Sequence, residues 1–160
     1  MNLITEIENK KHFLNGSTIS LAQEKELLEK IPSEFNADWL FKIMKKYPIS
    51  GVCFSLSKKD DLSGLGLELK WFSASEIIDE MFQYYPGILI CKSGYLPIGG
   101  CLKGSGDPYF LKIKSIENLK DPAIVRIPHD YVTNENTYPE DKIEIVCESL
   151  SVFFHNSKLY

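Results

Sequence analysis

Residues 65–86, LGLELKWFSASEIIDEMFQYYP, contain a change of hydrophobic period from that of a strand to that of a helix. Apolar side chains occupy every second position over residues 65–71, and this period of two predicts a half-buried strand. Ser73 and Glu76 then have the spacing of a capping box, which predicts the start of a helix that Pro86 ends. The alternating apolar residues, which we expect to face the core, are Leu65, Leu67, Leu69 and Trp71.

The sequence before this stretch predicts helices. Ser20 and Gln23 form a second capping box, ahead of an amphipathic run that a proline ends. Residues 37–47 also have apolar side chains at helical spacing and are followed by a proline. Residues 1–14 are expected to form a short helix, and residues 1–30 an N-terminal helical arm of the same domain.

The remaining sequence predicts strands and a closing helix. Short runs rich in β-branched and aromatic residues predict strands at residues 49–56, 88–92, 95–101, 109–113 and 123–127. A closing helix is expected from Pro139, with Ile143, Val146, Leu150, Phe153 and Phe154 as its apolar stripe. This order of elements predicts one α+β domain, with N-terminal helices, one inserted helix and a closing helix packed on a mostly antiparallel, twisted sheet.

Composition and charge restrict the class of partner. The chain has 160 residues, close to the size of one domain, with 18 basic and 22 acidic side chains. Arg126 is the only arginine, so we expect no direct nucleic-acid binding. The net charge of −4 comes entirely from residues 129–160. No apolar run is long enough for a membrane span, and no secretory signal precedes the helices, so a cytoplasmic location is expected.

The cysteines and histidines do not have the spacing of metal ligands. Cys53, Cys91, Cys101 and Cys147 lie far apart in apolar stretches, which is typical of reduced thiols used as small core residues. The three histidines are equally scattered. We therefore expect neither a metal nor a cofactor.

The glycine-rich residues 99–108, GGCLKGSGDP, match no phosphate-binding or nucleophile motif. They predict a tight β-hairpin in which Gly104 and Gly106 adopt positive φ angles. Asp107 is expected to lock this turn by accepting hydrogen bonds from backbone amides.

A hydrolytic site is the alternative interpretation of this region. Ser105 could be combined with Asp107, His129 and Asp130 into a triad, but any chain of this size offers similar combinations. The run His129-Asp130-Tyr131 is expected to form a solvated turn. We therefore expect a protein that is not an enzyme, with a small hydrolase as the alternative.

Acidic residues near the C-terminus are candidates for binding a protein. On the expected closing helix, Asp141, Glu144 and Glu148 would share one exposed face, with Asp130 and Glu135 nearby in sequence. This face either serves solubility or mimics phosphate and binds a basic cleft. The next candidates are exposed parts of the hairpin, represented by Tyr95, Lys103 and Tyr109.

The hairpin also resembles a known family. Residues 95–99, Tyr-Leu-Pro-Ile-Gly, and the Gly-Asp turn with the strand after it are similar to the central hairpin of the SUKH superfamily. Residues 122–127 resemble the next strand of that family, residues 144–154 its closing helix, and residues 31–35 its Leu-Pro-x-x-Tyr opening. The resemblance spans residues 31–154, and it predicts a SUKH-like domain over residues 31–160. The chain departs from the family at residues 48–51, Pro-Ile-Ser-Gly, where the family often has Asn-Gly-Gly.

This resemblance implies a non-enzymatic binding domain. Bacterial members are immunity proteins that bind and neutralise secreted toxins, many of them nucleases or deaminases, and fungal relatives regulate cell-wall assembly through protein contacts. The resemblance therefore predicts a bacterial immunity protein whose partner is a basic toxin domain. The alternative within the same class is a regulatory scaffold.

Overall fold

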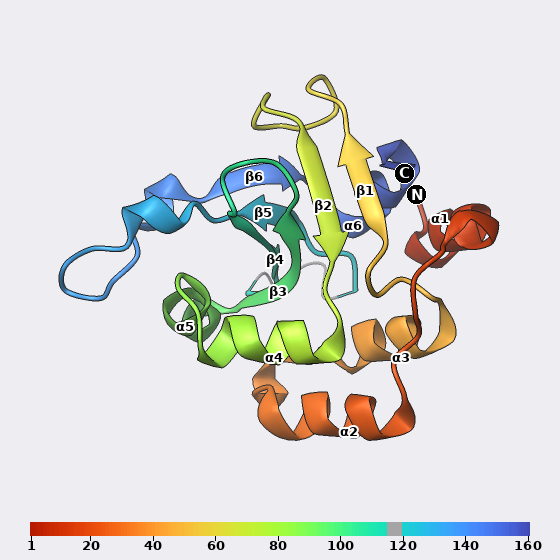
Figure 1. Ribbon diagram of the computed structural model, residues 1–160, viewed down its shortest axis with the longest axis horizontal. Coiled ribbons are helices and arrows are strands. Elements are labelled where there is room, and N and C mark those ends of the chain that lie inside the picture. The colour runs from red at the N-terminus through yellow and green to blue at the C-terminus, as the bar shows by residue number, and fades with distance from the viewer. Residues whose placement is uncertain (115–119) are drawn as a thin grey trace.

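The computed structural model describes residues 1–114 and 120–160, in which seven strands form one curled antiparallel sheet (Figure 1). The strand order is β6-β5-β4-β3-β2-β1-β7, so only β7 lies beside a strand distant in sequence. The strands are β1 (Cys53–Leu56), β2 (Leu67–Trp71), β3 (Tyr95–Cys101), β4 (Pro108–Lys112), β5 (Ile124–Arg126), β6 (Glu144–Cys147) and β7 (Lys158–Leu159). The predicted α+β class is confirmed.

The helices lie mainly below and beside this sheet (Figure 1). They are α1 (Leu3–Lys10), α2 (Leu21–Lys30), α3 (Asp38–Lys46), α4 (Ala74–Phe82), α5 (Gly87–Ile90) and α6 (Leu150–Asn156). Both predicted capping boxes are present, at Ser20 with Gln23 and at Ser73 with Glu76. In each box the serine oxygen accepts from the third helical amide, which satisfies a donor that the helix leaves free.

An aromatic cluster joins the closing helix to the sheet. Phe54 of β1 packs against Phe153 and Phe154 of α6, with ring centroids 5.4 and 5.7 Å apart. Trp71 of β2 completes the cluster, 6.2 Å from Phe54 and tilted against Phe154. These large side chains are almost fully buried, so they make a major contribution to the hydrophobic free energy of folding.

The N-terminal helix packs beside this closing helix, and the two chain ends lie close together (Figure 1). Ile7 of α1 is fully buried. The Lys10 ammonium donates to the Ser157 carbonyl at 2.6 Å, and His155 Nδ1 lies 3.1 Å from a Glu6 carboxylate oxygen. These contacts hold the first helix against the last one.

The predicted strand over residues 88–92 is wrong. These residues form α5 and the 3₁₀ turn Cys91–Ser93. Gly87 lies so close to the Glu80 carbonyl that a Cβ atom there would collide with it, and this close approach folds the chain back against α4. A short apolar run fits a buried helix as well as a buried strand, so periodicity alone could not distinguish them.

The predicted closing helix begins eleven residues too early, because Pro139 precedes a 3₁₀ turn and strand β6 instead. Residues 144–147 pair with β5, and Ser149 then caps α6 by accepting from the amide of Val152 at 3.2 Å. A partner strand satisfies the backbone groups that a helix would have satisfied internally. Of the predicted stripe, Leu150, Phe153 and Phe154 are buried on α6, whereas Val146 is buried from a strand and Ile143 is half-buried ahead of it.

The strand expected from residue 65 also begins later. Leu65 is 60% exposed in the β1–β2 loop, while Leu67, Leu69 and Trp71 of β2 are buried as predicted. Gly64 and Gly66 both have positive φ angles, so the backbone on either side of Leu65 turns away from strand geometry.

Candidate functional site

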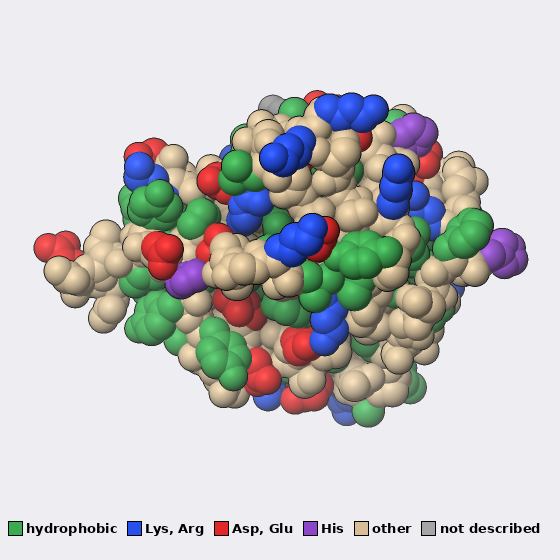
Figure 2. Space-filling model, turned by 45° about the horizontal axis from the view of Figure 1, so that its top comes forward, with side chains coloured by type: hydrophobic (Ala, Val, Ile, Leu, Met, Phe, Trp, Pro, Cys, Tyr) green, Lys and Arg blue, Asp and Glu red, His purple; other side chains and the backbone are tan. Residues whose placement is uncertain are grey.

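An acidic segment projects from one end of the molecule. Residues 128–143 connect β5 to β6 and extend away from the sheet (Figure 1), and acidic side chains are exposed along the projection (Figure 2). We call these residues the acidic segment. Of the predicted binding residues, it contains Asp130, Glu135 and Asp141, all exposed.

Hydrogen bonds within the acidic segment define its shape. The Thr133 amide donates to the Thr137 carbonyl at 3.0 Å, and the two threonine hydroxyls lie 2.7 Å apart. Asn136 has a φ of 54°, a left-handed conformation that asparagine tolerates in turns. At the base, the Tyr138 hydroxyl donates to the Pro128 carbonyl at 2.6 Å. The segment is therefore a closed loop that presents its acidic side chains from a preorganised backbone.

Asp107 joins the β3–β4 hairpin to the acidic segment. Its Oδ1 accepts from the His129 amide at 3.1 Å and lies 2.7 Å from His129 Nδ1. The prediction that Asp107 locks its own turn is therefore wrong. The predicted positive φ angles of Gly104 and Gly106, 69° and 68°, are confirmed. The turn is instead stabilised by Ser105 Oγ, which accepts from the Asp107 amide at 3.3 Å.

The residues of the alternative hydrolytic site come close together without forming a Ser-His-Asp triad. Asp107 contacts His129 Nδ1, as the acid of a triad would. His129 Nε2, however, lies 3.1 Å from a carboxylate oxygen of Asp130, and the hydrogen bond of Ser105 Oγ goes to a backbone amide. The expected turn at residues 129–131 is a single 3₁₀ turn with exposed side chains.

The predicted shared face of Asp141, Glu144 and Glu148 does not exist, because the helix that would carry it is a turn and a strand. Glu144 lies in β6 and accepts from Arg126 Nε at 2.6 Å. Arg126 is only 6% exposed and also donates to Ser63 Oγ at 2.8 Å. Glu148 is exposed in the turn that follows β6. Glu144 is thus held by an internal ion pair, whereas Glu148 faces solvent.

The two predicted hairpin tyrosines are buried. Tyr95 is 4% exposed and Tyr109 is 1% exposed, so their side chains cannot serve as a binding surface in this conformation. Tyr109 lies opposite Arg126 in the β4–β5 register, and burial raises the pKa of its hydroxyl. Lys103 is exposed as expected, and its ammonium forms an ion pair with Glu68.

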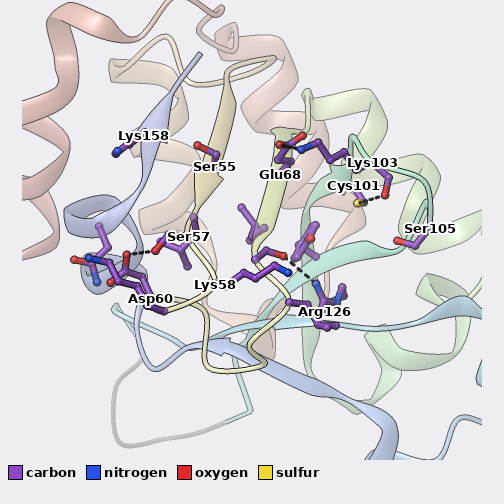
Figure 3. Close-up of a pocket in the computed structure, with 17 residues that line it drawn as sticks. Ser55, Ser57, Lys58, Asp60, Glu68, Cys101, Lys103, Ser105, Arg126 and Lys158 are labelled. Atoms are coloured by element: carbon purple, nitrogen blue, oxygen red, sulfur yellow. Dashed lines mark hydrogen bonds and ion pairs between the residues drawn. The ribbon is translucent and has the colours of Figure 1, made fainter.

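A polar cavity of about 620 Å³ opens beside this hairpin (Figure 3). Its walls come from the β1–β2 loop, the hairpin turn and the C-terminal residues. Its charged lining residues are Lys58, Lys59, Asp60, Glu68, Lys103, Arg126 and Lys158. Sequence reasoning missed the cavity, because Lys58 and Lys59 indicate only a loop and the residues that face them are distant in sequence.

Sequence reasoning also missed a group of exposed aromatic side chains. Phe82, Tyr84 and Tyr85, at the end of α4 and just after it, are each about half exposed, as is Tyr131 of the acidic segment. Figure 1 shows the end of α4 and the acidic segment on the same side of the molecule. The spacing of Phe82 and Tyr85 suits a buried helical stripe, but α4 ends at Phe82 and both side chains are about half exposed.

Over residues 1–114 and 120–160, no group of three or more His, Cys, Asp and Glu side chains could hold a metal ion. The four cysteines are free thiols, two of them buried. None of the described helices is both long enough and apolar enough to cross a membrane.

Comparisons with protein-family models, with curated proteins and with solved structures found no match to this chain.

Proposed function

We propose that this chain is a non-enzymatic protein-binding module of the immunity type, which neutralises a basic toxin domain in the cytoplasm of a bacterium. The observation that carries the proposal is the projecting acidic segment. Asp130, Glu135, Glu140 and Asp141 are exposed along it, and Lys142 is its only lysine.

Charge on a projection suits the capture of a basic partner. The Asp130 carboxylate is 83% exposed, and Glu135 lies at the far turn, where a partner can approach. Aligned acidic groups attract a basic surface over about one Debye length, roughly 8 Å at physiological salt. Such steering increases the association rate and helps to orient the partner.

Aromatic residues supply the contacts that charge alone does not. Stable interfaces gain most of their affinity from a few desolvated anchors, among which tyrosine is enriched. Tyr131 lies within the acidic segment, with the Lys142 ammonium 5.1 Å from its ring centroid. Tyr84 and Tyr85 are exposed just after α4, whose end lies on the same side of the molecule as the acidic segment (Figure 1). We infer that these tyrosines anchor the partner after the acidic groups have attracted it.

The resemblance of the hairpin and the strand after it to the SUKH superfamily supports the immunity type within this class. A regulatory scaffold would use the same kind of surface and remains the alternative. The effect on a toxin distinguishes the two functions. An immunity protein binds one toxin tightly enough to restore growth of a cell that produces it, and a regulatory scaffold does not.

The test is co-expression with a toxin domain encoded beside this protein, followed by binding kinetics over a range of ionic strengths. The variant combines Asp130→Lys with Glu135→Lys. Its control combines Glu26→Lys with Glu29→Lys, which makes the same charge change on the exposed face of α2. We expect the segment variant to associate about tenfold more slowly at low salt and to lose most of its salt dependence.

The control variant should associate like the unaltered protein. If the protein neither binds the toxin nor restores growth, the immunity type is excluded. If both variants bind at the unaltered rate, the acidic segment is not the interface.

A further inference from the structure

The cavity beside the hairpin carries positive charge on a chain that is acidic overall. Two of its cations are neutralised locally: Lys103 by Glu68, and Arg126 by Glu144. Lys58, Lys59 and Lys158 form no ion pair with any of the residues described. The one remaining acid, Asp60, accepts a hydrogen bond from Ser57 at 2.5 Å. The lining therefore has a surplus of about two positive charges.

Among the cations of the lining, the side chains of Lys58 and Arg126 point toward each other (Figure 3). Figure 3 shows the Lys58 side chain extending from the β1–β2 loop toward Arg126 on β5, while Lys158 lies on the opposite side, on β7. Like charges repel, so an anion placed between or beside them would be stabilised by both. The Arg126 donor that faces the loop makes only a weak contact, from Nη1 to the Gly66 carbonyl at 3.5 Å.

Neutral donors surround the same space. Ser55, Ser105 and Asn156 line the cavity beside the lysines, whereas the Ser57 hydroxyl already donates to Asp60. Hydroxyl, amide and ammonium donors together are suited to phosphate oxygens, which accept several hydrogen bonds at once. A phosphate monoester carries about −1.5 to −2 charges at neutral pH, which matches the surplus in the lining.

We propose that this cavity binds a small phosphate monoester. Its volume of about 620 Å³ lies within the range of small-molecule sites. Lys58, Lys59 and Lys158 supply the charge, and the Ser55 and Ser105 hydroxyls with the Asn156 amide fix the orientation of the phosphate group. The proposal is independent of the toxin-binding function, because none of the acidic segment lines the cavity.

The test titrates the full chain with adenosine 5′-monophosphate, with inorganic phosphate and with adenosine, using calorimetry and amide chemical shifts. The variant combines Lys58→Gln with Lys59→Gln, both in an exposed loop. The control combines Lys25→Gln with Lys42→Gln, on exposed faces of α2 and α3. We expect saturable binding of the monophosphate and shifts centred on residues 57–60, with adenosine alone not bound. The cavity variant should bind roughly tenfold more weakly or worse, and the control should bind unchanged.

Several results would overturn the proposal. It is overturned if neither phosphate compound saturates the protein at millimolar concentration, or if the cavity variant binds as well as the control. Binding of adenosine as strongly as of its monophosphate would show that the base is recognised rather than the phosphate. A single-stranded oligonucleotide is titrated in the same way, and saturation by it alone would make the site a nucleic-acid surface. If inorganic phosphate binds as tightly as the monophosphate, the occupant is the free anion and not an ester. Melting temperatures of both variants check that each remains folded.

Discussion

At the scale of single residues, two glutamates four positions apart have different environments. Glu144 is partly buried and forms an ion pair with Arg126, which has almost no access to water. Glu148 is exposed and has neither a hydrogen bond nor an ion pair with the described residues. A buried charge that loses its partner costs far more than an exposed charge that never had one.

Replacing each glutamate by alanine tests this difference. We expect Glu144→Ala to lower the free energy of unfolding by about 1–3 kcal/mol, because it leaves the Arg126 guanidinium buried with fewer partners. Glu148→Ala, the matched control, should change it by less than about 0.5 kcal/mol. Chemical denaturation measures both values. Equal effects of the two substitutions would show that the Arg126–Glu144 pair contributes no stability.

Among the secondary-structure elements, strand β2 includes only one of two leucines that share the alternating pattern, because it begins after Leu65. Leu69 is 0% exposed at the centre of the sheet, whereas Leu65 is 60% exposed before the strand begins. Leu69→Ala removes buried apolar surface and leaves a cavity, and it should cost about 2–5 kcal/mol. Leu65→Ala should cost less than about 0.5 kcal/mol. Thermal unfolding distinguishes them, and a Leu69→Ala protein with an unchanged Tm would contradict the assigned register.

For the whole molecule, the free energy of unfolding depends on pH through carboxyl groups whose pKa values are shifted in opposite directions. The Lys11 ammonium and the Tyr47 hydroxyl lower the pKa of Glu8 to about 2, and the pKa of Glu68 is lowered chiefly by Lys103. Such groups stabilise the fold above their unfolded pKa, and this contribution is lost as the pH falls toward the folded value. Burial raises the pKa of Glu80 to about 7, although the Gly87 amide opposes the shift.

The Glu80 carboxyl should therefore make the protein less stable as the pH rises from about 4.5 to about 7. Over that range the unfolded chain loses the proton while the folded chain still holds it, so deprotonation favours unfolding. We expect Glu80→Gln to remove this decline and to be the more stable protein at pH 8, by about 1–3 kcal/mol. Urea unfolding at a series of pH values measures the effect. Parallel pH profiles of the two proteins would mean that Glu80 is ionised in the fold at neutral pH.

Local sequence patterns are sufficient to predict the α+β class, both capping boxes, the hairpin with its two glycines and the charge concentrated near the C-terminus. These features depend on periodicity, side-chain capping and backbone conformation, which act over a few neighbouring residues. They were sufficient to predict Asp141 as an exposed acid, with Asp130 and Glu135 nearby in sequence, although Asp141 lies in a 3₁₀ turn and not on the predicted helix.

The other features could not be predicted from local patterns, because they depend on partners distant in sequence. Residues 144–147 form a strand since β5 offers them backbone partners, and Glu144 then meets Arg126 rather than solvent. Asp107 binds His129, and not its own turn, because the chain returns beside the hairpin after β5. The cavity is likewise assembled from a loop, a hairpin turn and the C-terminal strand. Long-range pairing competes with local preference, and where it satisfies more backbone groups and buries more apolar surface, it determines the structure.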